Sequence, residues 1–210
     1  MFAISPESDA APTFAAGLAL AMALTFSCSN GNDGDGNSGG GNSCDIKNYK
    51  TVKIGDQTWM AGNLNCNVSG SKCYNDSTSY CNKYGRLYDW ETAMRACPSG
   101  WHLPSYEEWK QLADYVENDK ECTDCTGKYL KATSGWYSNG NGQDTYDFSA
   151  MPGGYYNGNH FGDVGYHGSW WSSSEGNSSN AYAHGMGYDG EYTGIYNHKD
   201  VWFSVRCLQN

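Results

Sequence analysis

The chain has few basic residues, and none of them lies in its first 44 positions. It contains 13 Lys and Arg against 23 Asp and Glu, which gives a net charge of −10. A protein that binds nucleic acid needs a basic patch or stripe for the phosphates, and this chain has none. We therefore expect no nucleic-acid partner.

The sequence offers no apolar run of the length that crosses a bilayer. The apolar stretch 14–26 has 13 residues, whereas a spanning helix needs about 20. Its length is typical of a secretion signal. Ser27-Cys28 after it resembles the cleavage site of bacterial lipoprotein signals, although no Lys or Arg precedes the stretch and Thr25 replaces the usual aliphatic residue. We predict a lipoprotein signal peptide over residues 1–27, with Cys28 as the lipid attachment site.

A segment of low complexity follows Cys28. Residues 29–43 are almost wholly Gly, Asn, Ser and Asp, a composition that buries no apolar surface. We predict that residues 28–43 form a flexible, lipid-anchored linker and that residues 44–210 form one domain. This layout places the protein in the cell envelope, on the outer membrane or cell surface. Plain secretion with a disordered leader is the alternative.

Cysteine is abundant, with nine residues. Removal of Cys28 leaves an even number, which in a secreted chain implies a disulfide framework with 105 possible pairings. A zinc site would need a second Cys-x-x-Cys besides the one at Cys122 and Cys125. Redox activity of this pair is disfavoured, because the flanking Glu121 and Asp124 oppose a thiolate.

Local patterns predict an N-terminal hairpin and two helices. Residues 49–54 and 57–60 flank a Gly-Asp turn, and the polar stretch 62–82, with three cysteines, is expected to be a stapled loop. The first helix is expected over residues 89–96, with Asp89 as its N-cap. The second begins at Ser105, where Glu108 completes a capping box. Apolar residues then recur at helical spacing: Trp109, Leu112, Ala113 and Val116.

Helical periodicity disappears after Asn118, and the C-terminal part is unusually rich in aromatic residues and glycine. Residues 148–151, 169–172, 181–186 and 201–208 are predicted to be short strands between Gly, Asn and Ser loops. The whole chain has 17 Tyr, 8 Trp and 27 Gly, an excess that indicates a loop-rich domain lined by aromatic rings.

Motifs over nearly the whole mature domain resemble the Fibrobacter succinogenes major paralogous domain. They are 59–64 (WMAGNL), 84–88 (YGRLY), 97–100 (CPSG), 101–109 (WHLPSYEEW), 130–136 (LKATSGW), 148–154 (FSAMPGG), 170–173 (WWSS) and 203–207 (FSVRC). The family is similar to the C-type-lectin-like fold as used by formylglycine-generating enzymes. The resemblance implies a secreted, often lipid-anchored α+β domain, with two helices on a small twisted antiparallel sheet whose N- and C-terminal strands pair, and long disulfide-stapled loops.

The same resemblance bears on the cysteines. It implies a disulfide between Cys97 and Cys207, which ties a helix to the last strand in lectin-like folds. Cys73 with Cys81, across the polar loop, is the next expected pair. Elimination then leaves Cys122 with Cys125 and Cys44 with Cys66. Oxidase chemistry does not carry over from the formylglycine-generating enzymes, because only Cys207 follows residue 125.

Metal binding and catalysis have no motif in this chain. No lectin-type sugar motif is present. The candidate oxygen ligands for a metal are scattered among loops, and they are Asp163, Glu175, Asp189, Glu191 and Asp200. None of the five histidines has a metal-binding partner at helical spacing, and His102 is expected to pack in its Trp-His-Leu-Pro corner. We expect no metal, no cofactor and no enzymatic activity, with a hidden acid pair such as Glu175 and Asp189 as the alternative to test.

The aromatic-rich segment is the remaining candidate site. Aromatic faces stack on sugar rings, while Asn and Ser supply orienting hydrogen bonds. The candidates are Trp136, Tyr137, Tyr155, Tyr156, Tyr166, Tyr188, Tyr192 and Tyr196. We predict a non-catalytic surface module that contacts polysaccharide, such as plant cell-wall glycan, through these rings. The alternative is a structural or protein-interaction domain of the cell envelope without glycan affinity.

Overall fold

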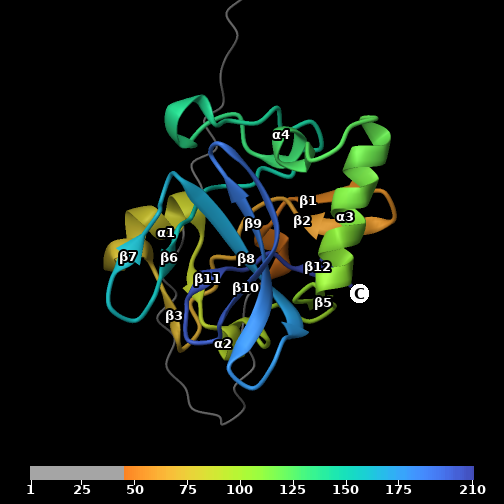
Figure 1. Cartoon of the computed structure of the whole chain (residues 1–210). Coiled ribbons are helices and arrows are strands. Elements are labelled where there is room, and N and C mark those ends of the chain that lie inside the picture. Colours follow the sequence, from red (N-terminus) through yellow and green to blue (C-terminus); the bar gives the residue numbers. More distant parts are fainter. Residues whose placement is uncertain (1–44) are drawn as a thin grey trace, which may run out of the picture. The chain divides into compact units, whose positions relative to one another are not determined.

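A computed structural model describes residues 45–210, apart from the side chains of residues 191–193 (Figure 1). The expected signal peptide, the lipid-attachment residue Cys28, the linker and Cys44 lie outside the described residues. None of the helices within the described range combines the length and the apolarity that a membrane span requires.

The described chain is an α+β domain of short helices and mostly antiparallel strands. Its helices are η1 (Ile46–Asn48), η2 (Tyr74–Asp76), α1 (Thr78–Tyr84), α2 (Trp90–Ala93), α3 (Tyr106–Asp119), α4 (Thr126–Leu130) and η3 (Tyr137–Asn139). Its strands are β1 (Thr51–Ile54), β2 (Gln57–Met60), β3 (Ser71–Lys72), β4 (Leu87–Tyr88), β5 (Trp101–His102), β6 (Tyr155–Tyr156), β7 (Phe161–Gly162), β8 (His167–Glu175), β9 (Asn180–Gly187), β10 (Gly190–His198), β11 (Phe203–Ser204) and β12 (Leu208–Gln209).

The N-terminal hairpin and the C-terminus share one sheet, whose order is β1-β2-β12-β5. The hairpin β1–β2 forms as predicted, with Ile54 opposite Gln57. The C-terminal strand joins it through β2, because Leu208 lies opposite Trp59. The terminal strands were therefore correctly expected to share a sheet, although β12 adds to the second strand of the hairpin instead of the first.

A second, larger sheet has the order β10-β9-β8-β11-β4-β3. The expectation of a single antiparallel sheet is wrong, since β11 runs parallel to β8 where Ser204 meets Trp170. The predicted strand 201–208 is in fact divided, with β11 in this sheet and β12 in the other. The residues between them are fully buried, and Arg206 is among them. The C-terminal segment thus joins the two sheets.

Helix α3 follows the prediction closely. The Ser105 side chain accepts from the backbone N–H of Glu108, and the Glu108 carboxylate accepts from the backbone N–H of Ser105, which is the expected capping box. The predicted apolar stripe, which includes Trp109 and Val116, is buried. In Figure 1, α3 stands beside strands β8–β10, and α1 and the β6–β7 hairpin lie on the other side of these strands.

The expectation of two helices is wrong, because the structure has four α-helices within residues 45–210. Helix α1 lies inside the stretch 62–82 that was expected to be a loop, and α4 follows the point where periodicity ended. Both are short, with seven and five residues, and a helix of that length is marginal by itself. Tertiary packing of Cys81, Tyr84 and Leu130 supports them instead. Helix α2 is capped by Asp89 as predicted but ends at Ala93.

The central strands β8 and β9 of the larger sheet are buried on both faces. Neighbouring residues of a strand point to opposite sides, so Trp170 packs against α3 while Trp171 packs in a separate core with Phe203. The consecutive buried tryptophans follow from this two-sided packing. The segment 148–151 is not a strand as predicted and makes only an isolated bridge, between Ala150 and Lys131.

Candidate functional site

Three of the eight aromatic candidates meet at the surface, and we call them the tyrosine cluster. Tyr137 belongs to η3, Tyr166 precedes β8, and Tyr188 lies between β9 and β10. The rings of Tyr137 and Tyr166 stack with centroids 4.3 Å apart, and Tyr188 meets them edge-on at 5.5 and 5.7 Å. Tyr137 is 51% exposed and Tyr166 is 40% exposed. The cluster therefore presents aromatic rings to solvent.

Backbone contacts hold the three segments together. The N–H of Tyr137 donates to the carbonyl of Gly165 at 2.8 Å, and the N–H of Tyr188 donates to the carbonyl of Tyr166 at 2.9 Å. Gly140 allows the η3 loop to approach, because a Cβ there would lie 2.3 Å from the carbonyl oxygen of Tyr188. The cluster thus lies where β8 begins and where β9 turns into β10, at one end of these strands.

A hollow of about 290 Å³ adjoins Tyr188. Its polar walls come from α4, η3, the β9–β10 turn and the loops beside them, and include Asp124, Lys128, Asn139, Asn141 and Asp189. Lys131 also lines it, but its ammonium donates to the carbonyl of Gly187 at 2.9 Å. Amide and carboxylate groups therefore lie beside the aromatic rings.

The hydroxyl group of Tyr166 stays protonated at neutral pH. Desolvation, followed by the neighbouring Tyr137, raises the pKa of Tyr166 above that of a free phenol. A protonated phenol both donates and accepts hydrogen bonds. The cluster can accordingly offer ring faces and hydroxyl donors together.

The other aromatic candidates do not join this cluster. Trp136 is a core residue, 5% exposed, and its indole N–H donates to the carbonyl of Ala150 at 3.0 Å. Tyr155 and Tyr156 lie in the β6–β7 hairpin, where Tyr156 contacts the ring of Trp202 at 5.3 Å. The ammonium of Lys72 lies 5.2 Å from the Tyr156 ring.

Tyr196 is 47% exposed and contacts Tyr182 near the opposite end of β9 and β10 from Tyr188. The side chain of Tyr192 lies outside the described residues. The candidates therefore do not form the one aromatic face that the sequence suggested, because three different parts of the fold present them.

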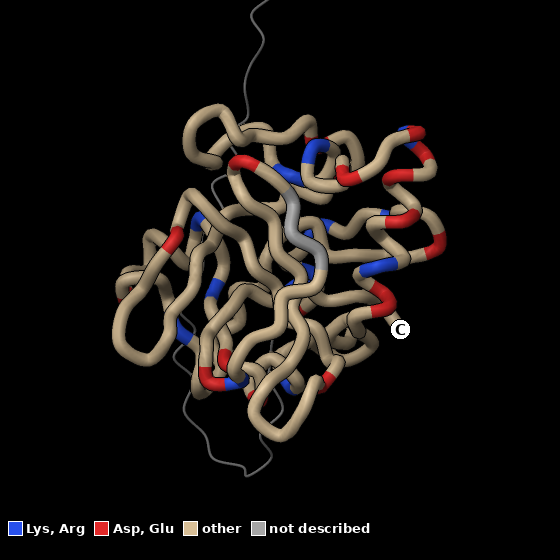
Figure 2. The backbone as a smooth tube through the Cα atoms, viewed as in Figure 1, with Lys and Arg blue, Asp and Glu red and all other residues tan. Residues whose placement is uncertain are grey.

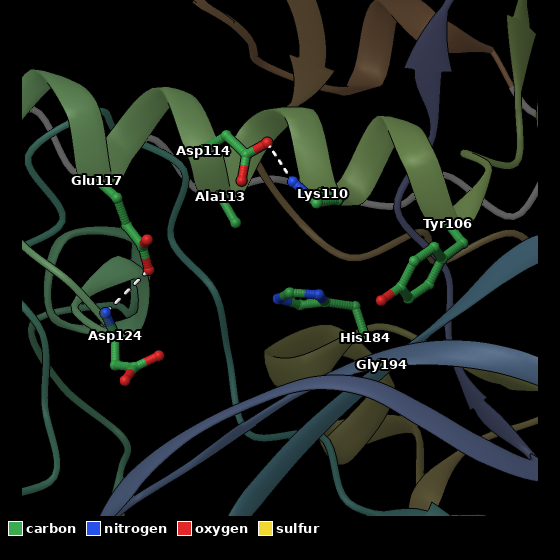
Figure 3. Close-up of a pocket in the computed structure, with 8 residues that line it drawn as sticks. All are labelled: Tyr106, Lys110, Ala113, Asp114, Glu117, Asp124, His184 and Gly194. Atoms are coloured by element: carbon green, nitrogen blue, oxygen red, sulfur yellow. Dashed lines mark hydrogen bonds and ion pairs between the residues drawn. The ribbon is translucent and has the colours of Figure 1, made fainter.

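A second hollow, which we call the α3 pocket, lies between α3 and strands β9 and β10 (Figure 3). It measures about 180 Å³. Its walls are Tyr106, Lys110, Ala113, Asp114 and Glu117 of α3, Asp124 of the following loop, His184 of β9 and Gly194 of β10. Lys110 pairs with Asp114 at 2.5 Å, and the carboxylate of Glu117 accepts from the backbone N–H of Asp124 at 3.0 Å.

His184 is the buried polar group of the α3 pocket. It is 5% exposed, and its ring lies parallel to the indole of Trp109. Burial lowers the pKa of His184 from 6.5 to about 4, so the imidazole is neutral at physiological pH. Sequence patterns did not single out this residue. Strand alternation could have indicated its burial, because within the predicted strand 181–186 it points to the same side as the buried Met186.

The scattered acids occupy separate environments. Asp163 pairs with His167 at 3.1 Å, Glu175 pairs with Lys199, and Asp189 lines the hollow beside the tyrosine cluster. Asp200 follows β10, and the side chain of Glu191 is outside the described set. No three His, Cys, Asp or Glu side chains among those described converge as metal ligands would.

His102 bridges two elements in its corner. Its ring nitrogens lie 2.8 Å from Oδ1 of Asn210 and 3.0 Å from Oε1 of Glu108. These contacts join the C-terminus to the start of α3, a structural role that agrees with the packing expected of this residue.

Three of the expected disulfides are present: Cys97–Cys207, Cys73–Cys81 and Cys122–Cys125. Cys66 is also disulfide-bonded, and its expected partner, Cys44, lies outside the described residues. Cys122 and Cys125 follow α3, so their bridge also shapes the loop that carries Asp124 into the α3 pocket.

Residues 52–209 match the Fibrobacter succinogenes major domain. The chain belongs to this family, and the match covers almost all of the described fold. No curated protein and no solved structure matches the chain.

Proposed function

We propose that this domain is a non-catalytic carbohydrate-binding module that contacts polysaccharide through the tyrosine cluster. The observation that carries the proposal is the mutual stacking of Tyr137 and Tyr166, with both rings exposed, beside a hollow with amide and carboxylate walls. Exposed aromatic faces cover the apolar faces of sugar rings, and neighbouring polar groups fix the orientation. Plant cell-wall glycan is the expected ligand class.

The positions of the acids support a role without catalysis. Glycoside hydrolysis needs two carboxyl groups about 5–10 Å apart. Glu175 ends β8, whereas Asp189 follows the end of β9 that pairs with the start of β8. Eight strand steps separate these ends, which corresponds to roughly 25 Å. Glu175 also pairs with Lys199. The suspected acid pair is therefore too widely spaced for this chemistry.

We also propose that the domain is a variant of the C-type-lectin-like fold. The pairing of the terminal strands in one sheet supports this kinship, as does the disulfide between Cys97 and Cys207. The additional helices α1 and α4 would then be elaborations of its loops.

For localisation we propose a lipid anchor at Cys28, with residues 28–43 as a tether that displays the domain on the outer membrane or cell surface. The composition of residues 1–43 supports this arrangement. Mass spectrometry of the N-terminus from a bacterial host should find an acylated Cys28. A mature chain that begins elsewhere, or lacks the acyl group, contradicts the anchor.

The binding proposal is tested by retention of the purified protein on insoluble cellulose, xylan and peptidoglycan. We expect retention on at least one of them, weakened about tenfold or more by Tyr137→Ala or Tyr166→Ala, which corresponds to a loss of about 1.4 kcal/mol. Tyr196→Ala is the matched control, because Tyr196 is equally exposed but lies outside the cluster. If Tyr196→Ala weakens retention and Tyr137→Ala does not, the polysaccharide binds near Tyr196 and not at the tyrosine cluster.

The alternative function is a structural or protein-interaction domain of the envelope. The exposed aromatic groups at three places would then serve as protein contacts. Failure to bind any of the three polysaccharides, together with specific retention of envelope proteins, would favour this alternative.

A further inference from the structure

The α3 pocket lies in the most acidic part of the described chain. Residues 106–125 hold seven Asp and Glu and only two Lys. Figure 2 shows these acids along α3 and the loop after it, whereas the strands β8 and β9 carry few charges. Lys110 and Asp114 neutralise each other through their ion pair. Glu117 and Asp124 therefore leave the pocket with a net negative charge.

These two carboxylates keep unused hydrogen-bonding capacity. One oxygen of Glu117 accepts from the backbone N–H of Asp124 at 3.0 Å and lies 3.5 Å from the hydroxyl of Thr126. A carboxylate can accept about four hydrogen bonds. Figure 3 shows the carboxylates of Glu117 and Asp124 close together at one end of the pocket.

His184 faces the same space from the opposite wall. Figure 3 shows its imidazole projecting beneath α3, with Tyr106 on its other side. His184 is 5% exposed, and its imidazole nitrogens make no hydrogen bond within the part of the chain that the structure describes. They are not among the fully buried unpaired atoms, because His184 lines the pocket. A ligand in the pocket can therefore supply a hydrogen-bond partner to the imidazole. A neutral imidazole offers one donor and one acceptor.

The size of the pocket limits the ligand. About 180 Å³ is slightly larger than a cavity of about 150 Å³ that holds benzene. A lone metal ion does not fit these walls, because no three ligating side chains of the described residues converge. The negative charge of the pocket thus favours a cationic ligand, and its volume fits an organic cation with a single ring or a short chain.

We propose that the α3 pocket binds a small amino alcohol or amino sugar, with its ammonium group on the carboxylates of Glu117 and Asp124 and its hydroxyl group on His184. An ammonium group has three donors, which match the free carboxylate oxygens. Asp124 also lines the hollow beside the tyrosine cluster, but Glu117 and His184 line only the α3 pocket. The proposal does not depend on polysaccharide binding.

The test is calorimetric titration of the full chain at pH 7 with glucosamine and with ethanolamine. Glucose and ethylene glycol are the neutral controls of matching shape. We expect saturable binding of at least one amine and none of either neutral compound. Glucosamine alone would identify a ring-sized ligand, and ethanolamine alone would identify a short-chain one, and either result supports the site.

Variants locate the binding. The double variant Glu117→Gln with Asp124→Asn should weaken amine binding at least tenfold, and it changes side chains that are not buried, so the fold should persist. Glu91→Gln, which removes an exposed charge on α2, is the control and should have no effect. His184→Gln should weaken binding as well, with far-UV circular dichroism as a check of folding.

Three results overturn the proposal: no saturable binding of either amine, equal binding of glucose and glucosamine, or amine binding that the double variant leaves unchanged. Tyr137→Ala distinguishes this site from the tyrosine cluster. It should weaken polysaccharide retention about tenfold or more while amine binding persists. Loss of both together would place the amine at the cluster and contradict the α3 pocket.

Discussion

The imidazole of His184 lies flat against the indole of Trp109, with ring centroids 5.0 Å apart and planes inclined by 5°. This contact places a titratable group between a core tryptophan and the α3 pocket. Protein atoms shield the ring so thoroughly that desolvation lowers the pKa of His184 to about 4. The stability of the fold is therefore linked to the protonation of a single histidine.

We predict that the domain loses stability as the pH falls from about 6.5 to about 4. In the unfolded chain the histidine takes up a proton near pH 6.5, whereas in the folded domain it remains neutral until about pH 4. Protonation thus favours the unfolded state across this window, and the free energy of unfolding should fall by up to about 3 kcal/mol. Urea unfolding at pH 7.5, 5.5 and 4.5 measures the change.

The control for this prediction is His184→Gln, which has no proton to take up. Other titratable side chains line the pocket around this ring: Tyr106, Lys110, Asp114, Glu117 and Asp124. They remain in the variant, so any slope that they cause persists. The prediction fails if the variant loses as much stability between pH 6.5 and 4.5 as the wild type.

A second prediction concerns the buried Arg206. Its guanidinium donates to Phe148 and Ser149 carbonyls and to Oδ1 of Asn63, and it lies 4.2 Å from the Phe148 ring. Arg206→Lys keeps a cation but loses the planar fork that reaches these acceptors together. We expect the free energy of unfolding to fall by about 2–3 kcal/mol. Arg95→Lys, at an exposed position, should change it by less than about 0.5 kcal/mol. Comparable losses in the two variants would contradict this role of Arg206.

Local sequence signals predicted those elements that depend on local contacts. The Ser105–Glu108 capping box and the apolar stripe of α3 act within a few residues, and both are present in the structure. Strand β10 was missed because its sequence, GEYTGIYNH, has little apolar alternation. It forms by pairing with β9 along most of its length. Helices as short as α4 likewise depend on packing that no local pattern reveals.

The same distinction applies to the candidate sites. The sequence identified Tyr137, Tyr166 and Tyr188 as members of an aromatic set, but their meeting depends on two backbone contacts between distant segments. Trp136 lies in a similar stretch of sequence and yet is buried. Its indole N–H donates to the Ala150 carbonyl in the core. The α3 pocket joins a helix to a strand more than 60 residues later, so sequence spacing gave no sign of it.

A third prediction compares two disulfides. Cys97 and Cys207 are 110 residues apart, whereas Cys73 and Cys81 are eight apart. In the chain-entropy description, the disulfide that closes the longer loop adds about 4–5 kcal/mol to the free energy of unfolding, and the one that closes the shorter loop adds about 2.5 kcal/mol. Replacing both cysteines of the first pair by Ala should therefore lower the free energy of unfolding more than the same change in the second pair. Urea unfolding of the two double variants checks the order, and a reversed order would contradict it.

The last prediction links the tyrosine cluster to the close approach of Gly140. A Cβ at this position would lie 2.3 Å from the carbonyl oxygen and 2.7 Å from the Cα of Tyr188, so Gly140→Ala must push the η3 loop away from the β9–β10 turn. We expect a loss of about 1–3 kcal/mol in the free energy of unfolding, as for other overpacked sites. Because Tyr137 moves with the loop, retention on polysaccharide should fall as it does in Tyr137→Ala. Gly62→Ala is the matched control, since no atom lies within 4 Å of a Cβ there. If Gly140→Ala lowers stability but leaves retention intact, the contact between Tyr137 and Tyr188 is not needed for binding, and the ligand must rest on other rings.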